Sequence, residues 1–134
     1  MTLDVSSLSN AVRRLREGLT RYEREPADEQ LRDGLSQRFE FTYELSHKML
    51  RRYIREAAAS PEEIERMPFA DLIRTGNVQG LLRGDWPAWR GFREMRARTS
   101  HTYNAKVAAQ VASAIPAFLE EAEHLCAELQ RRLG

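Results

Sequence analysis

The residues best suited to chemistry are an arginine and a histidine, Arg96 and His101, five positions apart. A neutral imidazole can accept or donate a proton near pH 7, and a guanidinium can neutralise a pentacoordinate phosphoryl group. RNA carries its own nucleophile, the 2′-hydroxyl, so these two side chains could act on a phosphodiester without a metal ion. The residue types therefore suit phosphodiester chemistry that requires no metal.

The spacing decides whether the two side chains can meet. On a straight helix, five residues correspond to a rotation of about 500°, which leaves the side chains about 140° apart. They converge only if the helix ends between them, as Thr99 and Ser100 favour, or if they meet across a symmetric dimer. Because the chain has 19 arginines, the spacing alone is a weak signal. The alternative is a histidine that caps a helix end.

Other potentially reactive side chains lack partners. His124 follows Glu120 by four residues, but nothing nearby completes a metal site. His47 is expected to be a packing or surface residue. A single cysteine, Cys126, excludes an internal disulfide, and no set of cysteines and histidines has zinc-site spacing. We therefore expect neither a metal nor a cofactor.

Basic residues are unevenly distributed. The net charge of the whole chain is only +1, which argues against a general polyanion binder. Residues 83–106 hold six cations and two anions, so the other 110 residues sum to −3. We expect this segment to bind RNA phosphates through Arg93, Arg98, Ser100 and Lys106. The alternative is that these are ordinary solvated residues in an arginine-rich chain.

Apolar residues recur at helical spacing along the whole chain. The pattern predicts a helix before Pro26, a long helix over 28–58, a short helix over 60–76 that Pro68 restarts, and a weak helical patch at 78–82. Two more helices are expected over 86–98 and 104–133, with a corner at 99–102. No strand pattern occurs. The predicted fold is all-α, an antiparallel up-and-down bundle of four to five helices.

Chain length and hydropathy predict the number of domains and the relation to membranes. At 134 residues the chain is expected to form a single domain, residues 1–134. Its apolar runs are far shorter than the ~20 residues that span a bilayer. The first ten residues lack the features of a secretory signal. We expect a soluble, cytoplasmic protein that does not contact membranes.

Two motifs together resemble a known family. Residues 37–45, Gln-Arg-Phe-Glu-Phe-Thr-Tyr-Glu-Leu, resemble the second-helix hallmark of a HEPN subfamily first described as nucleotidyltransferase substrate-binding proteins. Residues 96–103 resemble its R-x4-H-x-Y signature. The Ser60-Pro61 helix start and Trp86 also fall where similar residues occur in that subfamily. The resemblance extends from about residue 5 to residue 130 and comprises two ordered motifs.

The resemblance implies a specific function. HEPN domains are helical bundles that usually dimerise so that both R-x4-H motifs line one cleft, and many are metal-independent ribonucleases. Members of this subfamily are typically paired, as toxins, with a minimal nucleotidyltransferase antitoxin. By this likeness Arg96 and His101 would be catalytic. Tyr103 would be the site where the partner attaches AMP, which would place a bulky anion beside both residues and block RNA.

Departures from the family pattern leave alternatives open. Ala97 replaces a usually polar residue, which places the cleavage rate in question. His47 replaces a common tryptophan, and Pro68 interrupts a usually continuous helix. The main alternative is a non-catalytic binding subunit that docks onto a minimal nucleotidyltransferase. A plain helical adaptor with an incidental basic corner is the third possibility.

The second-helix motif makes two structural predictions. Phe39 and Phe41 lie on different faces, which favours burial by the bundle core on one side and by a second subunit on the other. Glu40 and Glu44 form a like-charged i,i+4 pair that needs a nearby cation, such as Arg38 or Lys48. We do not expect these two carboxylates to belong to the active cleft.

Overall fold

The computed structural model describes residues 3–134, which fold into six α-helices and one short 3-10 helix without any strand in that range. This confirms the all-α prediction. The elements are α1 (Ser6–Arg24), α2 (Glu29–Ala57), α3 (Pro61–Arg66), α4 (Phe69–Val78), α5 (Trp86–Arg98), η1 (Thr99–His101) and α6 (Ala105–Leu133).

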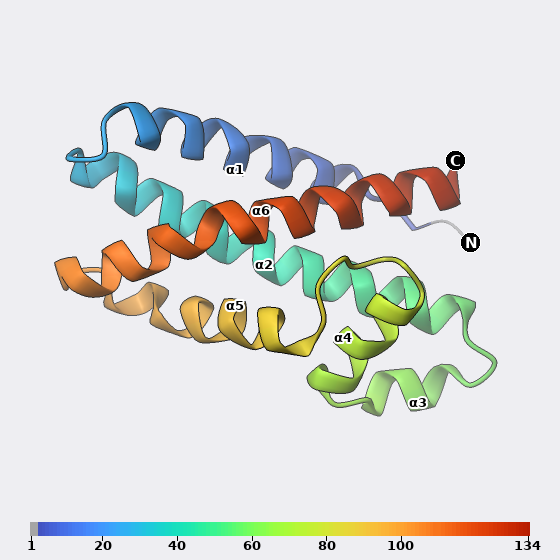
Figure 1. The fold of residues 1–134 in the computed structure, drawn as a ribbon. Coiled ribbons are helices and arrows are strands. Elements are labelled where there is room, and N and C mark those ends of the chain that lie inside the picture. The colour runs from blue at the N-terminus through green and yellow to red at the C-terminus, as the bar shows by residue number, and fades with distance from the viewer. Residues whose placement is uncertain (1–2) are drawn as a thin grey trace.

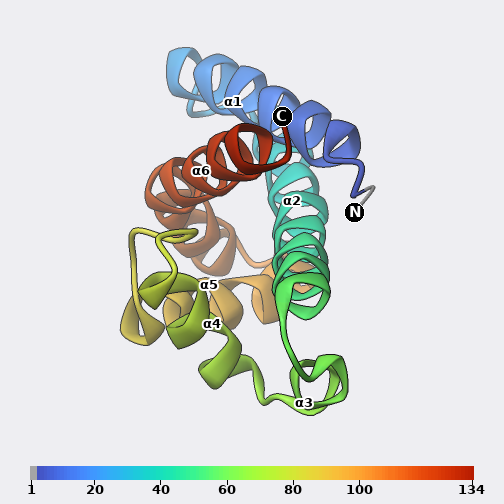
Figure 2. The ribbon, with the colours of Figure 1, turned by 90° about the vertical axis from the view of Figure 1, so that its right-hand side faces the viewer.

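Four helices form the body of the molecule. Helices α1, α2, α5 and α6 run alternately in opposite directions along the long axis (Figure 1). Helix α6 packs against α1, α2 and α5, and α1 packs against α2. The short helices α3 and α4 lie at the end of the bundle where α2 finishes, as the end-on view shows (Figure 2). The predicted up-and-down arrangement is therefore correct.

The break predicted at Pro68 is confirmed, and it divides the segment into two separate helices. The residue before Pro68 is extended (Met67, ψ 130°), so α3 cannot continue into α4. The predicted weak helical patch at 78–82 is wrong, because Val78 is the last residue of α4 and a turn follows it. Gly80 has a φ of 76°, and the backbone N–H groups of Leu81 and Leu82 both donate to the carbonyl of Gly76. A left-handed glycine ends a helix rather than extending it.

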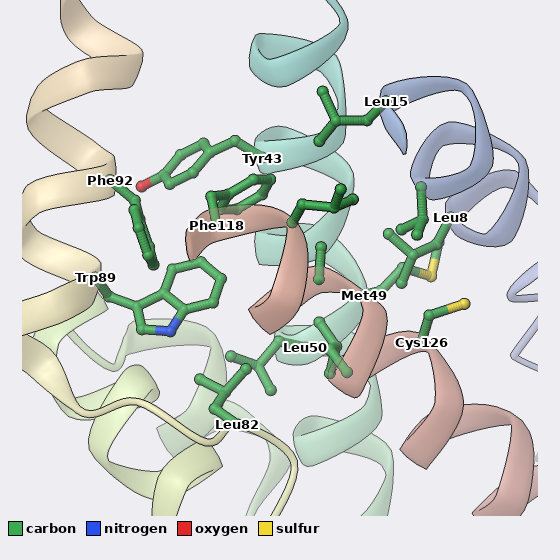
Figure 3. Packing of buried hydrophobic residues seen from close by; sticks show 14 of the residues in the cluster. Leu8, Leu15, Tyr43, Met49, Leu50, Leu82, Trp89, Phe92, Phe118 and Cys126 are labelled. Atoms are coloured by element: carbon green, nitrogen blue, oxygen red, sulfur yellow. The ribbon is translucent and has the colours of Figure 1, made fainter. Parts of the chain in front are cut away.

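Aromatic side chains from three helices form the centre of the core (Figure 3). The Phe118 ring of α6 meets Phe39 of α2 edge-on at 5.0 Å and Phe92 of α5 at 5.4 Å. Trp89 of α5 lies 5.9 Å from the same ring. Edge-to-face contacts of this kind add to the free energy gained by burial. They fix α5 against α2, and the candidate site lies between those two helices.

A buried carboxylate anchors the start of α5. Glu121 of α6 is 6% exposed and accepts hydrogen bonds from the indole N–H of Trp89 at 2.8 Å and from the amide of Gly84 at 2.9 Å. A third hydrogen bond comes from the amide of Arg83 at 3.2 Å. The loop between α4 and α5 is thus tied to α6, which sets the position of the whole α5 helix.

Candidate active site

The chain breaks its helix between the two residues of interest. Helix α5 ends at Arg98, η1 covers Thr99–His101, and α6 begins after Asn104, whose side chain accepts hydrogen bonds from the amides of Lys106 and Val107. The predicted helix end between Arg96 and His101 is confirmed. The backbone continues as a 3-10 turn through Thr99–His101, and Arg96 contacts α2 whereas His101 contacts Tyr103.

Arg96 is held by two carboxylates of α2. Its Nε donates to Glu44 Oε1 at 3.1 Å, and its Nη2 also bonds that oxygen and lies 3.5 Å from Glu40 Oε1. The hydrogen bond with Glu44 raises the pKa of the Arg96 guanidinium above its ordinary value. About one third of the Arg96 side chain stays exposed (32%). The guanidinium is therefore oriented by α2 while part of it still faces solvent.

Thr99 joins the same network from η1. Its hydroxyl lies 3.0 Å from Glu40 Oε2 and 2.7 Å from the Arg96 carbonyl oxygen, and it can donate to either acceptor. Glu40 thus contacts both Arg96 and Thr99. These contacts connect α2, α5 and η1 at a single point, so the position of the corner depends on the two α2 carboxylates.

The role of Glu40 and Glu44 differs from the sequence prediction. The expected cations were Arg38 or Lys48, but the cation between the two carboxylates is Arg96, 52 residues beyond Glu44. Arg38 instead donates to the carbonyl of Arg14 at 2.7 Å. The sequence did indicate that a cation must lie near Glu40 and Glu44, because they form a like-charged i,i+4 pair. It did not identify which cation.

His101 and Tyr103 face solvent together. The Tyr103 hydroxyl lies 3.5 Å from His101 Nδ1, and the two rings meet nearly edge-on at 5.9 Å. Tyr103 is 85% exposed. Within residues 3–134, no hydrogen bond joins His101 to Arg96. An exposed imidazole and phenol next to the α5 terminus are open to a large substrate.

The four basic or polar residues predicted to bind phosphate separate into two kinds. The Arg93 guanidinium lies over the Phe69 ring, 5.7 Å from its centroid, and Arg98 donates to Gln110 Oε1 at 2.6 Å. Ser100 and Lys106 have exposed side chains. Arg93 therefore contacts α4 and Arg98 contacts α6, whereas Ser100 and Lys106 lie in and just after the corner between α5 and α6. Their binding of RNA phosphates stays a prediction.

A small polar pocket of about 300 Å³ lies between α2 and the corner. Glu40, Thr99 and Thr102 line one part of it, and Ser36 and Gln37 line another. The Ser36 side-chain oxygen is buried and has no hydrogen-bond partner among the described residues. Buried hydroxyls are normally satisfied, so this pocket can receive a polar group of a ligand.

His47 is a packing residue, as predicted. Its half-buried ring contacts Phe69 with 4.4 Å between centroids. Burial, together with the nearby Arg51 and Arg93 charges, lowers the pKa of His47 to about 4. The remaining histidine, His124, donates from Nε2 to the Gly80 carbonyl at 3.0 Å. Both histidines serve the fold.

Between residues 3 and 134, no three histidine, cysteine, aspartate or glutamate side chains are grouped so that they could hold a metal ion. No helix in that range is long and apolar enough to cross a membrane.

Comparison with known proteins gave three consistent matches. Residues 3–131 match the family described as nucleotidyltransferase substrate binding protein like. The probable ribonuclease HepT of Haemophilus influenzae is 39% identical over 99 residues, which are 74% of this chain and 67% of that protein. The structure of HI0074 from Haemophilus influenzae, described as the fold of a substrate binding domain of a nucleotidyltransferase, has a TM-score of 0.88 and 31% identity. The structural alignment covers 95% of this chain and 99% of the HI0074 chain.

Proposed function

Because the chain belongs to the nucleotidyltransferase substrate-binding subfamily of HEPN proteins, we propose that it is a metal-independent RNA endonuclease, the toxin of a HEPN–nucleotidyltransferase pair. The observation that carries the proposal is the α5–η1 corner. There, an oriented but accessible Arg96 precedes an exposed His101 across a helix end. The similarity to a probable ribonuclease supports the same assignment.

The proposed reaction is an internal transesterification. A neutral His101 imidazole accepts the proton of the 2′-hydroxyl, the 2′-oxygen forms a bond to phosphorus, and the bond from phosphorus to the 5′-oxygen breaks. The 5′-oxygen leaves with a proton from an imidazolium, and the products are a 2′,3′-cyclic phosphate and a 5′-hydroxyl. The Arg96 guanidinium neutralises charge on the pentacoordinate phosphoryl group.

Control of this activity is assigned to Tyr103. We propose that a minimal nucleotidyltransferase transfers AMP from ATP to the phenol oxygen, which forms a bond to the α-phosphorus while pyrophosphate leaves. The phenol is 85% exposed and 3.5 Å from His101 Nδ1. A phosphate attached there would therefore lie against the imidazole and repel the RNA backbone.

A homodimer would bring two copies of the motif into one cleft. Phe41 of α2 supports this part of the proposal, because it is 61% exposed although its neighbour Phe39 is fully buried. Two copies would also supply two imidazoles, one to accept the 2′-hydroxyl proton and one to donate a proton to the leaving oxygen.

The test is RNA cleavage by the purified protein in EDTA, beside the His101→Ala and Arg96→Ala variants. We expect 2′,3′-cyclic phosphate ends from the wild-type protein and a loss of at least about 10²-fold in each variant. Tyr103 must first be shown by mass spectrometry to be unmodified. If the unmodified wild-type protein cuts no RNA, the assignment changes to a non-catalytic subunit that docks onto a nucleotidyltransferase. Ala97 favours that alternative.

A further inference from the structure

A basic groove runs along the C-terminal half of α2. It has a volume of about 540 Å³ and lies between α2 and α3. Its lining residues are Glu44, His47, Lys48, Arg51, Arg52, Arg55 and Glu65. Four of these are cations and two are anions, which gives a net charge of +2. The groove lies on α2 and α3, outside the basic segment 83–106 that comprises α5 and the following corner.

Internal contacts use some of these charges and leave others available. Arg51 donates to the carbonyls of Ile64 at 2.7 Å and Met67 at 3.0 Å, and so caps the end of α3. Arg55 pairs with Glu65. No hydrogen bond or ion pair within residues 3–134 involves the side chain of Lys48 or Arg52. These two lie one helical turn apart on the same face of α2.

The groove is continuous with the candidate active site. Glu44, which binds Arg96, is also the first residue of the groove wall. Arg93 lies one turn before Arg96 on α5, and its guanidinium lies over the ring of Phe69, which His47 also contacts. No hydrogen bond or ion pair among the described residues involves the Arg93 side chain, so its N–H groups are available to an anion. Cations therefore follow one another from Arg96 through Arg93 to Lys48 and Arg52.

We propose that this groove binds the phosphodiester backbone of the RNA substrate, with Lys48 and Arg52 contacting phosphates beyond the one at Arg96. The inference rests on the proposed function for the identity of the RNA. Unpaired cations at a spacing of one helical turn, beside a site that acts on a phosphodiester, suit successive phosphates. His47 adds no charge that would assist, because burial and the neighbouring arginines lower its pKa to about 4.

The test compares two double variants in a His101→Ala background, which prevents cleavage during the measurement. One is Lys48→Gln/Arg52→Gln. The matched control is Arg21→Gln/Arg24→Gln, which removes the same charge from two exposed residues near the end of α1. Glutamine preserves helix propensity, and circular dichroism melting confirms folding. The readout is the anisotropy of a short fluorescein-labelled single-stranded RNA as the salt concentration rises.

We expect the groove variant to bind this RNA about tenfold more weakly than the parent. Its slope of log K against log salt should become shallower by about 1.4, which is about 0.7 for each of two lost phosphate contacts. The control should change little. Equal affinities and slopes in the two double variants would overturn the groove assignment. So would an unchanged RNA affinity together with weaker binding of the groove variant to the nucleotidyltransferase, since the groove would then bind protein.

The binding and cleavage experiments together distinguish an incorrect groove assignment from an incorrect nuclease assignment. A wild-type protein that cuts RNA, combined with a groove variant of unchanged affinity, disproves only the groove. A wild-type protein that cuts nothing but whose RNA binding depends on Lys48 and Arg52 disproves the nuclease and retains the groove as an RNA site.

Discussion

Glu44 of α2 binds both Nε and Nη2 of Arg96, so the guanidinium at the end of α5 is oriented by a helix 52 residues earlier in the chain. A bonded guanidinium loses little further freedom when substrate arrives, and this lowers the entropic cost of placing its charge at the phosphate. The same carboxylate competes with the phosphate for that charge. Glu44 is therefore a positioning residue for the proposed reaction, with opposite effects on turnover and on RNA binding.

The Glu44→Gln variant tests this relationship. We expect kcat to fall about tenfold because the guanidinium is less well oriented, whereas KM should stay the same or decrease because a competing negative charge is lost. Steady-state cleavage of a labelled RNA measures both. The control is Glu17→Gln, which breaks the Arg13–Glu17 ion pair on α1 and should leave both constants unchanged. An increased KM with unchanged kcat would assign Glu44 to substrate binding instead.

The Tyr103→Phe variant separates regulation from cleavage. It should cut RNA within a few-fold of the wild-type rate, because the phenol hydroxyl has no role in the proposed transesterification. Incubation with the nucleotidyltransferase and ATP should inactivate the wild-type protein and leave the variant active. Mass spectrometry should find AMP on the wild-type chain alone. Inactivation of Tyr103→Phe would show that AMP is attached elsewhere or that the partner inhibits by binding.

The Phe41→Glu variant tests the dimer. Light scattering of the wild-type protein at micromolar concentration should give about twice 15.5 kDa. A charge at this exposed position of α2 should shift the mass towards that of the monomer and reduce cleavage in parallel. Val78→Glu is the control, because Val78 is even more exposed, at 85%, but lies at the end of α4. A monomeric wild-type protein that cuts RNA would exclude the shared cleft.

Stability should fall in mild acid because of His47. The pKa of His47 is about 4 in the folded protein, below its ordinary value of 6.5. Between those values the unfolded chain binds more protons, so the free energy of unfolding decreases as the pH falls from about 6.5 towards 4. Solvent screening of the half-buried ring reduces this loss to about 1 kcal/mol. Urea unfolding at several pH values should show a shallower slope in His47→Gln; an unchanged slope would assign the loss to other groups.

Glu121→Ala should be among the most destabilising substitutions outside the aromatic core. It leaves the indole N–H of Trp89 and the amides of Gly84 and Arg83 without their acceptor. We expect the free energy of unfolding to decrease by about 2–4 kcal/mol in urea titrations. The neighbouring Glu120→Ala on the exposed side of α6 should change it by less than about 0.5 kcal/mol. Similar losses in both variants would show that the Glu121 hydrogen bonds contribute little.

Local signals in the sequence predicted most of the fold. Apolar residues at intervals of three and four located the four bundle helices, and Thr99 and Ser100 located the end of α5, because helix formation depends mainly on near neighbours. Pro68 likewise located the break between α3 and α4. The same kind of signal failed at residues 78–82, where the left-handed turn at Gly80 follows the end of α4.

Only the tertiary structure decided which charges meet. Glu40 and Glu44 are recognisable in the sequence as a pair that needs a cation, but any of 19 arginines could have supplied it. Arg96 does so because aromatic packing around Phe118 fixes α5 against α2. The sequence also could not show which cations of α2 stay unpaired. Arg51 and Arg55 bond to residues of α3, whereas Lys48 and Arg52 make no such contact, and this depends on where α3 packs. Charge pairing over such distances follows from packing, which a linear pattern does not encode.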